Sequence, residues 1–380
     1  MTAPDTVCRP TFERAGIVSS GLGIVTRQCL RLKTSLSSFR KAMNTPHFSV
    51  IIPVHNGGSD FERCLDALDR SRFSDRELIV VDDGSTDRSA QLAQLCGAEV
   101  ISTDHPRGPG AARNLGAERA SGEFLFFVDA DCEVHPDTLD RAASALEAEP
   151  GLDALFGCYD DAPAAQNFIA QFKNLFHSYT HQQGGQDATT FWAGCGVVRR
   201  TVFAGIGGFD EEQFPRPSIE DIELGYRLRD SGFTIRLCKE VRVKHLKAWT
   251  FEQLMRSDIF DRGAPWTRLM LDRGRIDDTL NLRWSQRVSA ALAWLLVTGL
   301  LGAVWRSESL WLSGLSAFGL LVLNRDLYAY FARQRGVMFA MKAIPLHWFY
   351  YLYACLAFTI GAGGYALSRG RARRSRAEIR

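Results

Sequence analysis

Five consecutive apolar residues, Phe124 to Val128, run directly into Asp129-Ala130-Asp131, and this junction constrains the fold of the chain more than any other feature. A short run without polar residues is typical of a strand buried on both faces of a parallel sheet. Two carboxylates one residue apart at its end place hard oxygen ligands at the rim of the sheet, where a divalent cation can be held. The alternative is a pair of turn residues that cap the helix started by Pro136. The motif alone does not decide between these readings.

Apolar runs and amphipathic segments alternate in the region before this junction. The apolar runs predict strands at Phe48–Val54, Glu77–Asp82 and Val100–Ser102. The segments between them predict helices from about Asp60, which is expected to cap the first one, from Ser85 to Cys96, and from Gly110 to Ala120. Strands that alternate with helices imply a parallel sheet with both faces covered, and ligands bind such sheets at the carboxyl ends of the strands.

This rule brings four polar or glycine-rich segments to one edge of the predicted sheet. They are Pro53-Val54-His55-Asn56, Asp82-Asp83-Gly84-Ser85, the loop from Gly108 to Asn114, and Asp129-Ala130-Asp131. Each segment follows or adjoins an apolar run, so the coincidence favours a binding site over a set of ordinary turns.

The next part of the chain is less regular. Phe191 to Val198 is expected to form a strand interrupted by glycine, and Ser218 is expected to be the N-cap of a helix that opens with Glu220-Asp221. Acidic residues in a first helical turn have a purely structural explanation, since they complement the helix dipole.

Three uncharged segments near the end of the sequence predict membrane helices. They are Val288–Trp305, Leu310–Leu323 and Ala343–Ser368. The segment from Asn324 to Gly336 is expected to form an amphipathic helix at the membrane surface. The last twelve residues hold six arginines and one glutamate, which the positive-inside rule assigns to the cytosolic side. An even number of crossings would be needed to keep both ends there, so three apolar segments leave the topology open.

The remaining composition adds smaller constraints. A net charge of +2 gives no reason to expect nucleic acid as a partner, and nine singly spaced cysteines predict reduced thiols. Residues 1–45 form a basic segment that is expected to be a disordered arm, with Met43 as the translation start.

On these motifs the chain resembles a family-two glycosyltransferase with the Rossmann-like GT-A nucleotide-sugar fold. The resemblance covers residues 46 to about 250 and is specific, because several motifs occur in the order and spacing of the family. The residues that carry it are Ser49–Asn56, Val80–Asp87, Gly110–Asn114, Asp129–Asp131 and Glu220-Asp221.

The resemblance implies a role for each motif. It places Pro53, His55, Asn56, Asp83, Arg113 and Asp129 at the nucleotide sugar, with Asp83 on the base and Arg113 either on a phosphate or in solvent. It makes Asp131, with Asp129 and His245, the ligand set of Mg²⁺ or Mn²⁺, although a lone histidine after a strand is as easily structural. It makes Glu220-Asp221 the catalytic motif, with Asp221 as the general base.

The sequence therefore predicts an α/β GT-A domain with a parallel-rich central sheet, followed by C-terminal membrane helices. The expected division is an arm at 1–45, the catalytic domain at 46–250, an interfacial connector at 251–286, membrane segments at 287–368 and a cytosolic tail at 369–380. The catalytic domain is expected on the cytoplasmic face of the inner or plasma membrane, where nucleotide sugars are made.

The expected reaction is metal-dependent inverting transfer of a sugar to a lipid-linked or glycan acceptor. Processive relatives carry Gln-x-x-Arg-Trp before their membrane helices, whereas this chain has Leu280-Asn281-Leu282-Arg283-Trp284, which favours single addition. Two alternatives stay open at this point: a polyprenyl-phosphate glycosyltransferase, whose acceptor needs little general base, and a non-catalytic nucleotide-sugar-binding membrane protein. The motifs do not specify the sugar or the acceptor.

Overall fold

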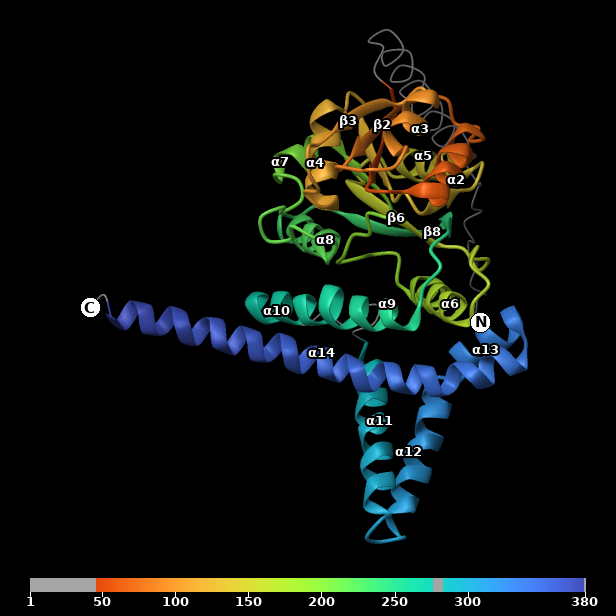
Figure 1. Ribbon diagram of the computed structural model, residues 1–380, viewed down its shortest axis with the longest axis vertical. Coiled ribbons are helices and arrows are strands. Elements are labelled where there is room, and N and C mark those ends of the chain that lie inside the picture. The colour runs from red at the N-terminus through yellow and green to blue at the C-terminus, as the bar shows by residue number, and fades with distance from the viewer. Residues whose placement is uncertain (1–45, 276–282, 379–380) are drawn as a thin grey trace, which may run out of the picture. The chain divides into compact units, whose positions relative to one another are not determined.

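The computed structural model describes residues 46–275 and 283–378, so the expected arm at 1–45 and the start at Met43 lie outside the described residues. The catalytic region is built on one sheet of eight strands in the order β3-β2-β1-β4-β7-β6-β8-β5 (Figure 1). Four strands of one half are parallel neighbours: β1 (Phe48–Val54), β2 (Arg76–Asp82), β3 (Glu99–Ser102) and β4 (Phe124–Val128). This confirms the α/β fold expected from the apolar runs.

The helices of this half follow the predicted alternation with shifted ends. They are α2 (Gly58–Asp69), α3 (Ser89–Leu95) and α4 (Pro109–Arg119). The expected cap at Asp60 is wrong, because the helix starts earlier: Gly57 is the N-cap residue and Asp60 lies in the first turn. All five residues of β4 are buried, as its composition predicts.

The other half of the sheet is mixed. It contains β5 (Cys132–Val134), β6 (Ala154–Tyr159), β7 (Cys195–Arg199) and β8 (Ile235–His245), with helices α5 (Thr138–Ala148), α6 (Phe168–Gln183), α7 (Arg200–Gly205) and α8 (Glu220–Asp230). The strand expected over Phe191–Val198 begins only at Cys195, because the preceding residues turn instead of pairing. Ser218 is not the N-cap of α8: that position belongs to Ile219, and the Ser218 hydroxyl donates to the Asp261 carbonyl.

Strand pairing at one edge places a histidine beside the acidic motif. β5 follows Asp131 directly and pairs antiparallel with β8, so that Cys132 is opposite His245. The Leu246 amide also donates to the Asp131 carbonyl at 2.9 Å. The position of His245 is therefore a consequence of register, although the residue lies more than a hundred positions further along the chain.

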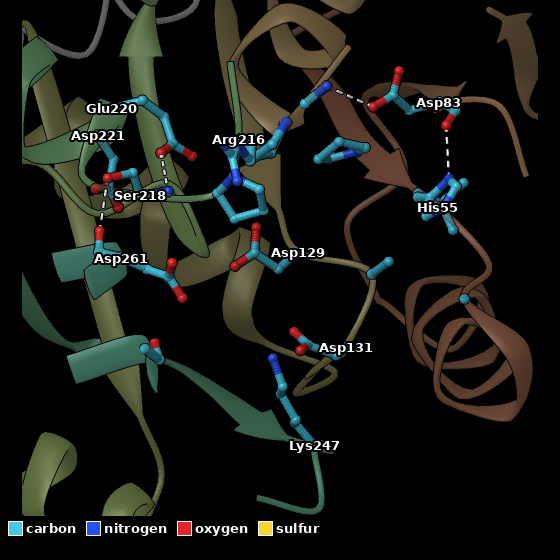
Figure 2. Close-up of a pocket in the computed structure, with 18 of the residues that line it drawn as sticks. His55, Asp83, Asp129, Asp131, Arg216, Ser218, Glu220, Asp221, Lys247 and Asp261 are labelled. Atoms are coloured by element: carbon cyan, nitrogen blue, oxygen red, sulfur yellow. Dashed lines mark hydrogen bonds between the residues drawn. The ribbon is translucent and has the colours of Figure 1, made fainter. Parts of the chain in front are cut away.

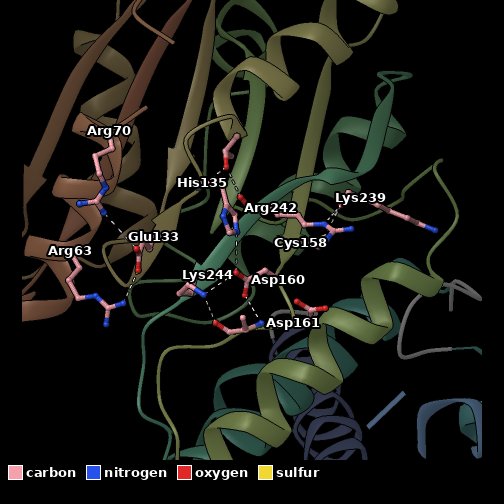
Figure 3. A network of polar contacts seen from close by, with 12 residues as sticks. Arg63, Arg70, Glu133, His135, Cys158, Asp160, Asp161, Lys239, Arg242 and Lys244 are labelled. Carbon is pink, nitrogen blue, oxygen red and sulfur yellow. Dashed lines mark hydrogen bonds and ion pairs between the residues drawn. The ribbon is translucent and has the colours of Figure 1, made fainter. Parts of the chain in front are cut away.

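A polar network on the outer side holds this edge in place (Figure 3). Glu133 on β5 pairs with Arg63 of α2 and with Arg70, the C-cap residue of the same helix. Asp160 accepts from His135 at 3.0 Å and pairs with Lys244 of β8 at 3.3 Å. These contacts connect β5 to α2 and β8, and so fix the strand that follows the Asp-x-Asp turn.

The chain continues into a series of helices. They are α9 (Phe251–Arg256), the π-helix η1 (Ser257–Gly263), α10 (Ala264–Arg273), α11 (Trp284–Gly302), α12 (Ser309–Leu323), α13 (Arg325–Arg335) and α14 (Val337–Glu378). α11 and α12 form a hairpin, while α14 runs alongside α10 (Figure 1). Among the described helices, the stretch Val337–Arg369 of α14 has the length and apolar composition needed to cross a membrane, whereas Ser309–Leu323 is shorter.

The predicted amphipathic segment at 324–336 forms α13, but its apolar face is not free for a membrane. Leu327, Tyr328 and Phe331 are buried in a cluster with Phe172 and Phe176 of α6 and with α14. The apolar periodicity predicted an amphipathic helix, and the structure has one. Its apolar face packs against α6 and α14 of the protein.

Candidate active site

The carboxyl ends of the parallel strands open into a cavity of about 840 Å³. Every site residue predicted from the sequence lines it: Pro53, His55, Asn56, Asp83, Arg113, Asp129, Asp131, Glu220, Asp221 and His245. We call the lining residues between 53 and 131 the first wall and those between 192 and 262 the second wall. Figure 2 shows the two acidic clusters, Asp129 with Asp131 and Glu220 with Asp221, in this cavity.

The first wall is held by hydrogen bonds between neighbouring strand ends. His55 donates through Nδ1 to the Asp83 carbonyl at 2.8 Å. Asn56 adopts a left-handed conformation with φ of 51°, and its side-chain oxygen accepts from the Thr86 amide at 2.8 Å. The conformation is uncommon outside glycine, and asparagine is among the residues that tolerate it best.

Asp83 has a structural task at the cavity that the sequence did not reveal. Its carboxylate accepts from the amides of Arg107 and Gly108, both at 2.8 Å, and from the Thr103 hydroxyl. A carboxylate has about four lone-pair sites, so three bonds leave capacity for one more donor. The side chain therefore positions the loop before α4 and still has room for one hydrogen bond from a ligand.

Arg113 joins the two acidic clusters. Its guanidinium contacts Asp129 Oδ1 at 2.6 Å through Nη2 and Glu220 Oε1 at 3.0 Å through Nη1. The side chain is buried, so the alternative of a solvent-exposed helix charge does not hold, while the phosphate contact stays a prediction. Because two of its nitrogens are committed to carboxylates, Arg113 serves the site chiefly by fixing the two walls together.

Asp129, Asp131 and His245 offer a donor set suited to a hard divalent cation. His245 Nε2 lies 3.5 Å from Asp131 Oδ2, and the other ring nitrogen faces Asn174 Oδ1 at 2.6 Å. An amide oxygen only accepts, so Nδ1 donates to Asn174, and in the neutral imidazole Nε2 then has a lone pair available for a cation. Carboxylate oxygens and one imidazole nitrogen fit Mg²⁺ or Mn²⁺.

Cys132 lies within 4.8 Å of both carboxylates but does not fit this set. The thiol is fully buried, and burial, reinforced by Asp131 and Asp129, raises its pKa well above the usual range. A protonated sulfur is a poor ligand for a hard cation, so His245 is the better third donor.

Asp221 is held by two backbone amides and has a raised pKa. Its Oδ2 accepts from the Ala193 amide at 3.2 Å, while Oδ1 accepts from the Ile222 amide of its own helix. Burial, with the neighbouring Glu220 charge, raises the pKa of Asp221 to about 6, against the opposing pull of Arg262 and Arg113. The carboxylate is ionised at neutral pH yet more basic than an ordinary aspartate.

Glu220 has a different environment from its neighbour. It is 5% exposed, accepts from the Ser218 amide at 2.9 Å and pairs with Arg113. Each oxygen of either carboxylate accepts from a protein donor, but Glu220 is buried and orients the start of α8, whereas Asp221 is half-buried at the cavity. Gly225 allows this helix to approach closely, because a Cβ there would lie 2.3 Å from the Phe191 amide nitrogen.

The second wall contains residues that the sequence did not identify. They are Arg216, Lys247, Gln253, Arg256, Ser257, Asp261 and Arg262. Lys247 points toward Asp131 (Figure 2) and helps to lower its pKa, which burial alone would raise. Most of these residues come from α9 and η1, a charged segment that contains no recognisable motif. The one signal in the sequence that could have identified a residue of this set is that Lys247 follows closely after His245.

An α/β sheet with an Asp-x-Asp motif at its rim, facing a second acidic cluster across one cavity, is the arrangement of the GT-A class of glycosyltransferases. The sequence comparison is more specific. Residues 49–207 match the profile described as glycosyl transferase family 2, so this part of the chain is a domain of that family. It is therefore a glycosyltransferase of a class that uses nucleotide-sugar donors.

Several known proteins are similar to this chain. Glycosyltransferase AglE of Haloferax volcanii is 29% identical over 265 residues, which cover 66% of this chain and 81% of that protein. The uncharacterized glycosyltransferase YibD of Escherichia coli is 38% identical over 114 residues, 29% of this chain and 33% of that protein. The solved mannosyltransferase PcManGT of Pyrobaculum calidifontis, in complex with GDP-Man and Mn²⁺, aligns at a TM-score of 0.49 with 16% identity, covering 83% of this chain and 87% of that one.

Proposed function

We propose that the protein transfers a sugar from a nucleoside-diphosphate sugar to a membrane-associated acceptor with inversion at the anomeric carbon. The observation that carries this proposal is that one cavity holds both acidic clusters, bridged by Arg113. Inverting transfer needs a cation site for the leaving diphosphate and a base opposite it for the acceptor hydroxyl, and the two clusters supply these groups.

We assign the donor to the first wall. The nucleoside lies against Pro53, His55, Asn56 and Asp83, and the diphosphate lies toward Asp129 and Asp131. Asp131, Asp129 and His245 would hold Mg²⁺ or Mn²⁺, which neutralises charge on a departing diphosphate when bound. Arg113 keeps Asp129 at the rim, and Asn174 keeps His245 in the tautomer whose lone pair faces the cation site.

We assign the acceptor to the second wall. Asp221 takes the proton of the acceptor hydroxyl as its oxygen attacks, and a pKa of about 6 lets the group accept a proton at neutral pH without being protonated beforehand. The Ala193 amide and the helix amide of Ile222 hold the carboxylate in place. Neither Arg283 nor Trp284 lines the cavity, which supports single addition over a processive reaction.

We also propose that the α11–α12 hairpin anchors the enzyme in a membrane. Large apolar side chains on both helices are exposed, including Trp294, Leu301, Trp311, Leu315 and Phe318 at 46–83%. Contiguous apolar surface of this kind marks a membrane or protein interface. The catalytic domain lies on the cytoplasmic side in this proposal, since nucleotide sugars are made there, and the acceptor is lipid-linked or a glycan.

The test compares two variants with a matched control. Asp131→Asn should lower transfer by about 10³-fold, because the cation contributes several kcal/mol. Asp221→Asn should lower it by about 10²–10⁴-fold, the usual contribution of a positioned base. Glu212→Gln, an exposed acid outside the cavity, should leave it unchanged. Nucleoside diphosphate release from UDP-, GDP- and dTDP-sugars in detergent with Mn²⁺ is the measurement, and full turnover in Asp131→Asn would refute the proposal.

A second candidate is transfer to a polyprenyl phosphate. The cations of the second wall, Lys247, Arg256 and Arg262 among them, favour it because they suit an acceptor that is itself a phosphate. Such an acceptor is already ionised and needs little general base. Activity that is lost in Asp131→Asn but retained in Asp221→Asn would select this candidate. Donor binding without turnover with any acceptor would instead indicate a non-catalytic nucleotide-sugar-binding protein.

A further inference from the structure

The long helix α14 has two distinct faces. Eight large apolar residues are 38–69% exposed along it: Val337, Met338, Met341, Phe349, Leu356, Phe358, Ile360 and Leu367. Because an α-helix turns about 100° per residue, all of these except Val337 and Phe358 fall within an arc of about 100°, and we call this arc the outer stripe. Lys342 is also exposed and lies on the same side.

The opposite face of α14 packs against the segment that closes the catalytic cavity. Tyr353 Oη donates to Asp258 Oδ2 at 2.8 Å, and Asp258 belongs to η1. A Cβ on Gly361 would lie 2.5 Å from the Ala264 carbonyl oxygen, and one on Gly263 would lie 2.6 Å from Ala357 Cβ. The backbones of α14, η1 and α10 are therefore in direct contact near the second wall of the cavity.

The contact between α14 and η1 contains charged side chains beside the middle of the apolar stretch of α14. Asp258 also forms an ion pair with Lys173 of α6, and both side chains are largely buried. Tyr353 is the central residue of Val337–Arg369, the 33-residue stretch with the composition of a membrane span. If that stretch crossed a bilayer, its midpoint, and the ion pair beside it, would lie in the hydrocarbon, where charges are expensive.

The length of the helix gives a second, geometric reason. At 1.5 Å per residue the 33 residues extend for about 50 Å, whereas the hydrocarbon core of a bilayer is about 30 Å thick. A helix that lies in the membrane plane has no such mismatch, and it needs one apolar face instead of an apolar circumference.

We propose that α14 lies along the membrane surface with its outer stripe in the bilayer, and that only the α11–α12 hairpin inserts. The occupant of the stripe is lipid because α14 packs on the hairpin that the proposed function places in the bilayer: Ala293 of α11, Leu320 of α12 and Tyr351 of α14 share one buried cluster. Lys342 can extend its ammonium group to the headgroups from such a position. Both ends of α14 then stay on the side of the catalytic domain, so three apolar segments give two crossings.

This arrangement places the second wall one helix away from the bilayer. α14 contacts lipid with one face and η1 with the other, and η1 supplies Asp261 and Arg262 to the cavity. The inference concerns the mode of membrane contact. It rests on the proposed anchoring and not on the chemistry of transfer, so it can fail while the catalytic proposal stands.

Depth measurements on the full chain test the proposal. A fluorophore is attached to Met338→Cys, Leu356→Cys or Leu367→Cys in a background that lacks Cys8, Cys29, Cys96 and Cys355. The protein is placed in phosphatidylethanolamine and phosphatidylglycerol vesicles with bromine at defined acyl positions. We expect shallow quenchers to act equally at all three sites. Stronger quenching by deep than by shallow bromines at position 356, with the reverse at positions 338 and 367, would overturn the proposal. Labelling of positions 338 and 367 by a membrane-impermeant thiol reagent from opposite sides of the vesicle would overturn it as well.

A glycine pair supplies an independent measurement. Gly361→Ala introduces a Cβ into the contact with α10 and should lower the apparent Tm by about 2–8 °C. Gly363→Ala is the matched control, because a Cβ there meets nothing within 4 Å and points toward the outer stripe. Equal effects of the two substitutions would contradict the packing of α14 on α10, and with it the surface orientation.

Discussion

The two walls of the cavity are built in different ways. The first wall consists of strand ends and the turns that follow them, joined by hydrogen bonds between neighbouring strands, such as that from His55 Nδ1 to the Asp83 carbonyl. The second wall is assembled from elements that are distant in sequence and joined by side chains, as in the Arg113–Glu220 and Lys173–Asp258 pairs, which span 107 and 85 positions. The first wall follows from the sheet itself, whereas the second depends on how α8, α9 and η1 are held by the rest of the protein.

Removing Arg113, which bridges the two walls, should have the largest effect on the free energy of unfolding. Arg113→Met leaves the buried Glu220 and the half-buried Asp129 without their partner, and breaking a buried ion pair in this way costs about 3–5 kcal/mol. Urea denaturation in detergent measures the loss. Arg119→Met, which removes an exposed pair with Glu99, is the control and should cost less than about 1 kcal/mol. Equal losses would mean that the walls do not depend on Arg113.

The second largest effect is expected on the affinity for the divalent cation, through the hydrogen bond that orients His245 at the sheet edge. Asn174→Ala removes the acceptor that orients His245, and the loss of such an outer hydrogen bond typically weakens metal binding about 10–100-fold. A Mn²⁺ titration followed by calorimetry measures this. Asn167→Ala on the same helix removes an N-cap, so it should cost about 1 kcal/mol of stability without changing the Mn²⁺ affinity. Unchanged affinity in Asn174→Ala would argue against His245 as a ligand.

The pH dependence of transfer tests the role proposed for Asp221 in the second wall. Transfer should fall about tenfold per pH unit below pH 6, because Asp221 becomes protonated there. Arg262→Met removes a cation that stabilises the Asp221 carboxylate, so this acid limb should move upward by about one pH unit. Arg216→Met is the comparison, since Arg216 is not among the causes of the Asp221 shift. A profile whose acid limb stays fixed in Arg262→Met would show that another group sets it.

The smallest expected effect lies outside the cavity. Arg63→Met removes one exposed partner of Glu133 on β5, and surface ion pairs contribute about 0.2–1 kcal/mol. Arg70 remains as a second partner, so transfer should be unchanged and the urea midpoint nearly so. A clear loss of activity would show that the outer network of Figure 3 controls the Asp-x-Asp turn more strongly than its exposure suggests.

The sequence predicted much of the first wall because local signals there agree. β4 was predicted by five apolar residues and α4 by a glycine-rich start, and the rule for parallel sheets brought their ends together without any tertiary information. Arg113 was placed in the site for another reason: its spacing suggested a phosphate contact or a solvated charge, whereas burial between two acids makes it a bridge. Residues such as Arg262 carried no signal, because no periodicity or motif ties η1 to a cavity.

What the sequence by itself determined is the α/β alternation, the family and the chemistry of the acidic motifs, since these depend on short-range order and on residue type. Only the tertiary structure decided that Glu220 is buried while Asp221 is half-buried at the cavity, that His245 lies beside Asp131, and that α14 presents one face to η1. The physical reason is that pairing register, burial and long-range charge contacts arise between segments that the chain separates by tens of residues, where local pattern carries no information.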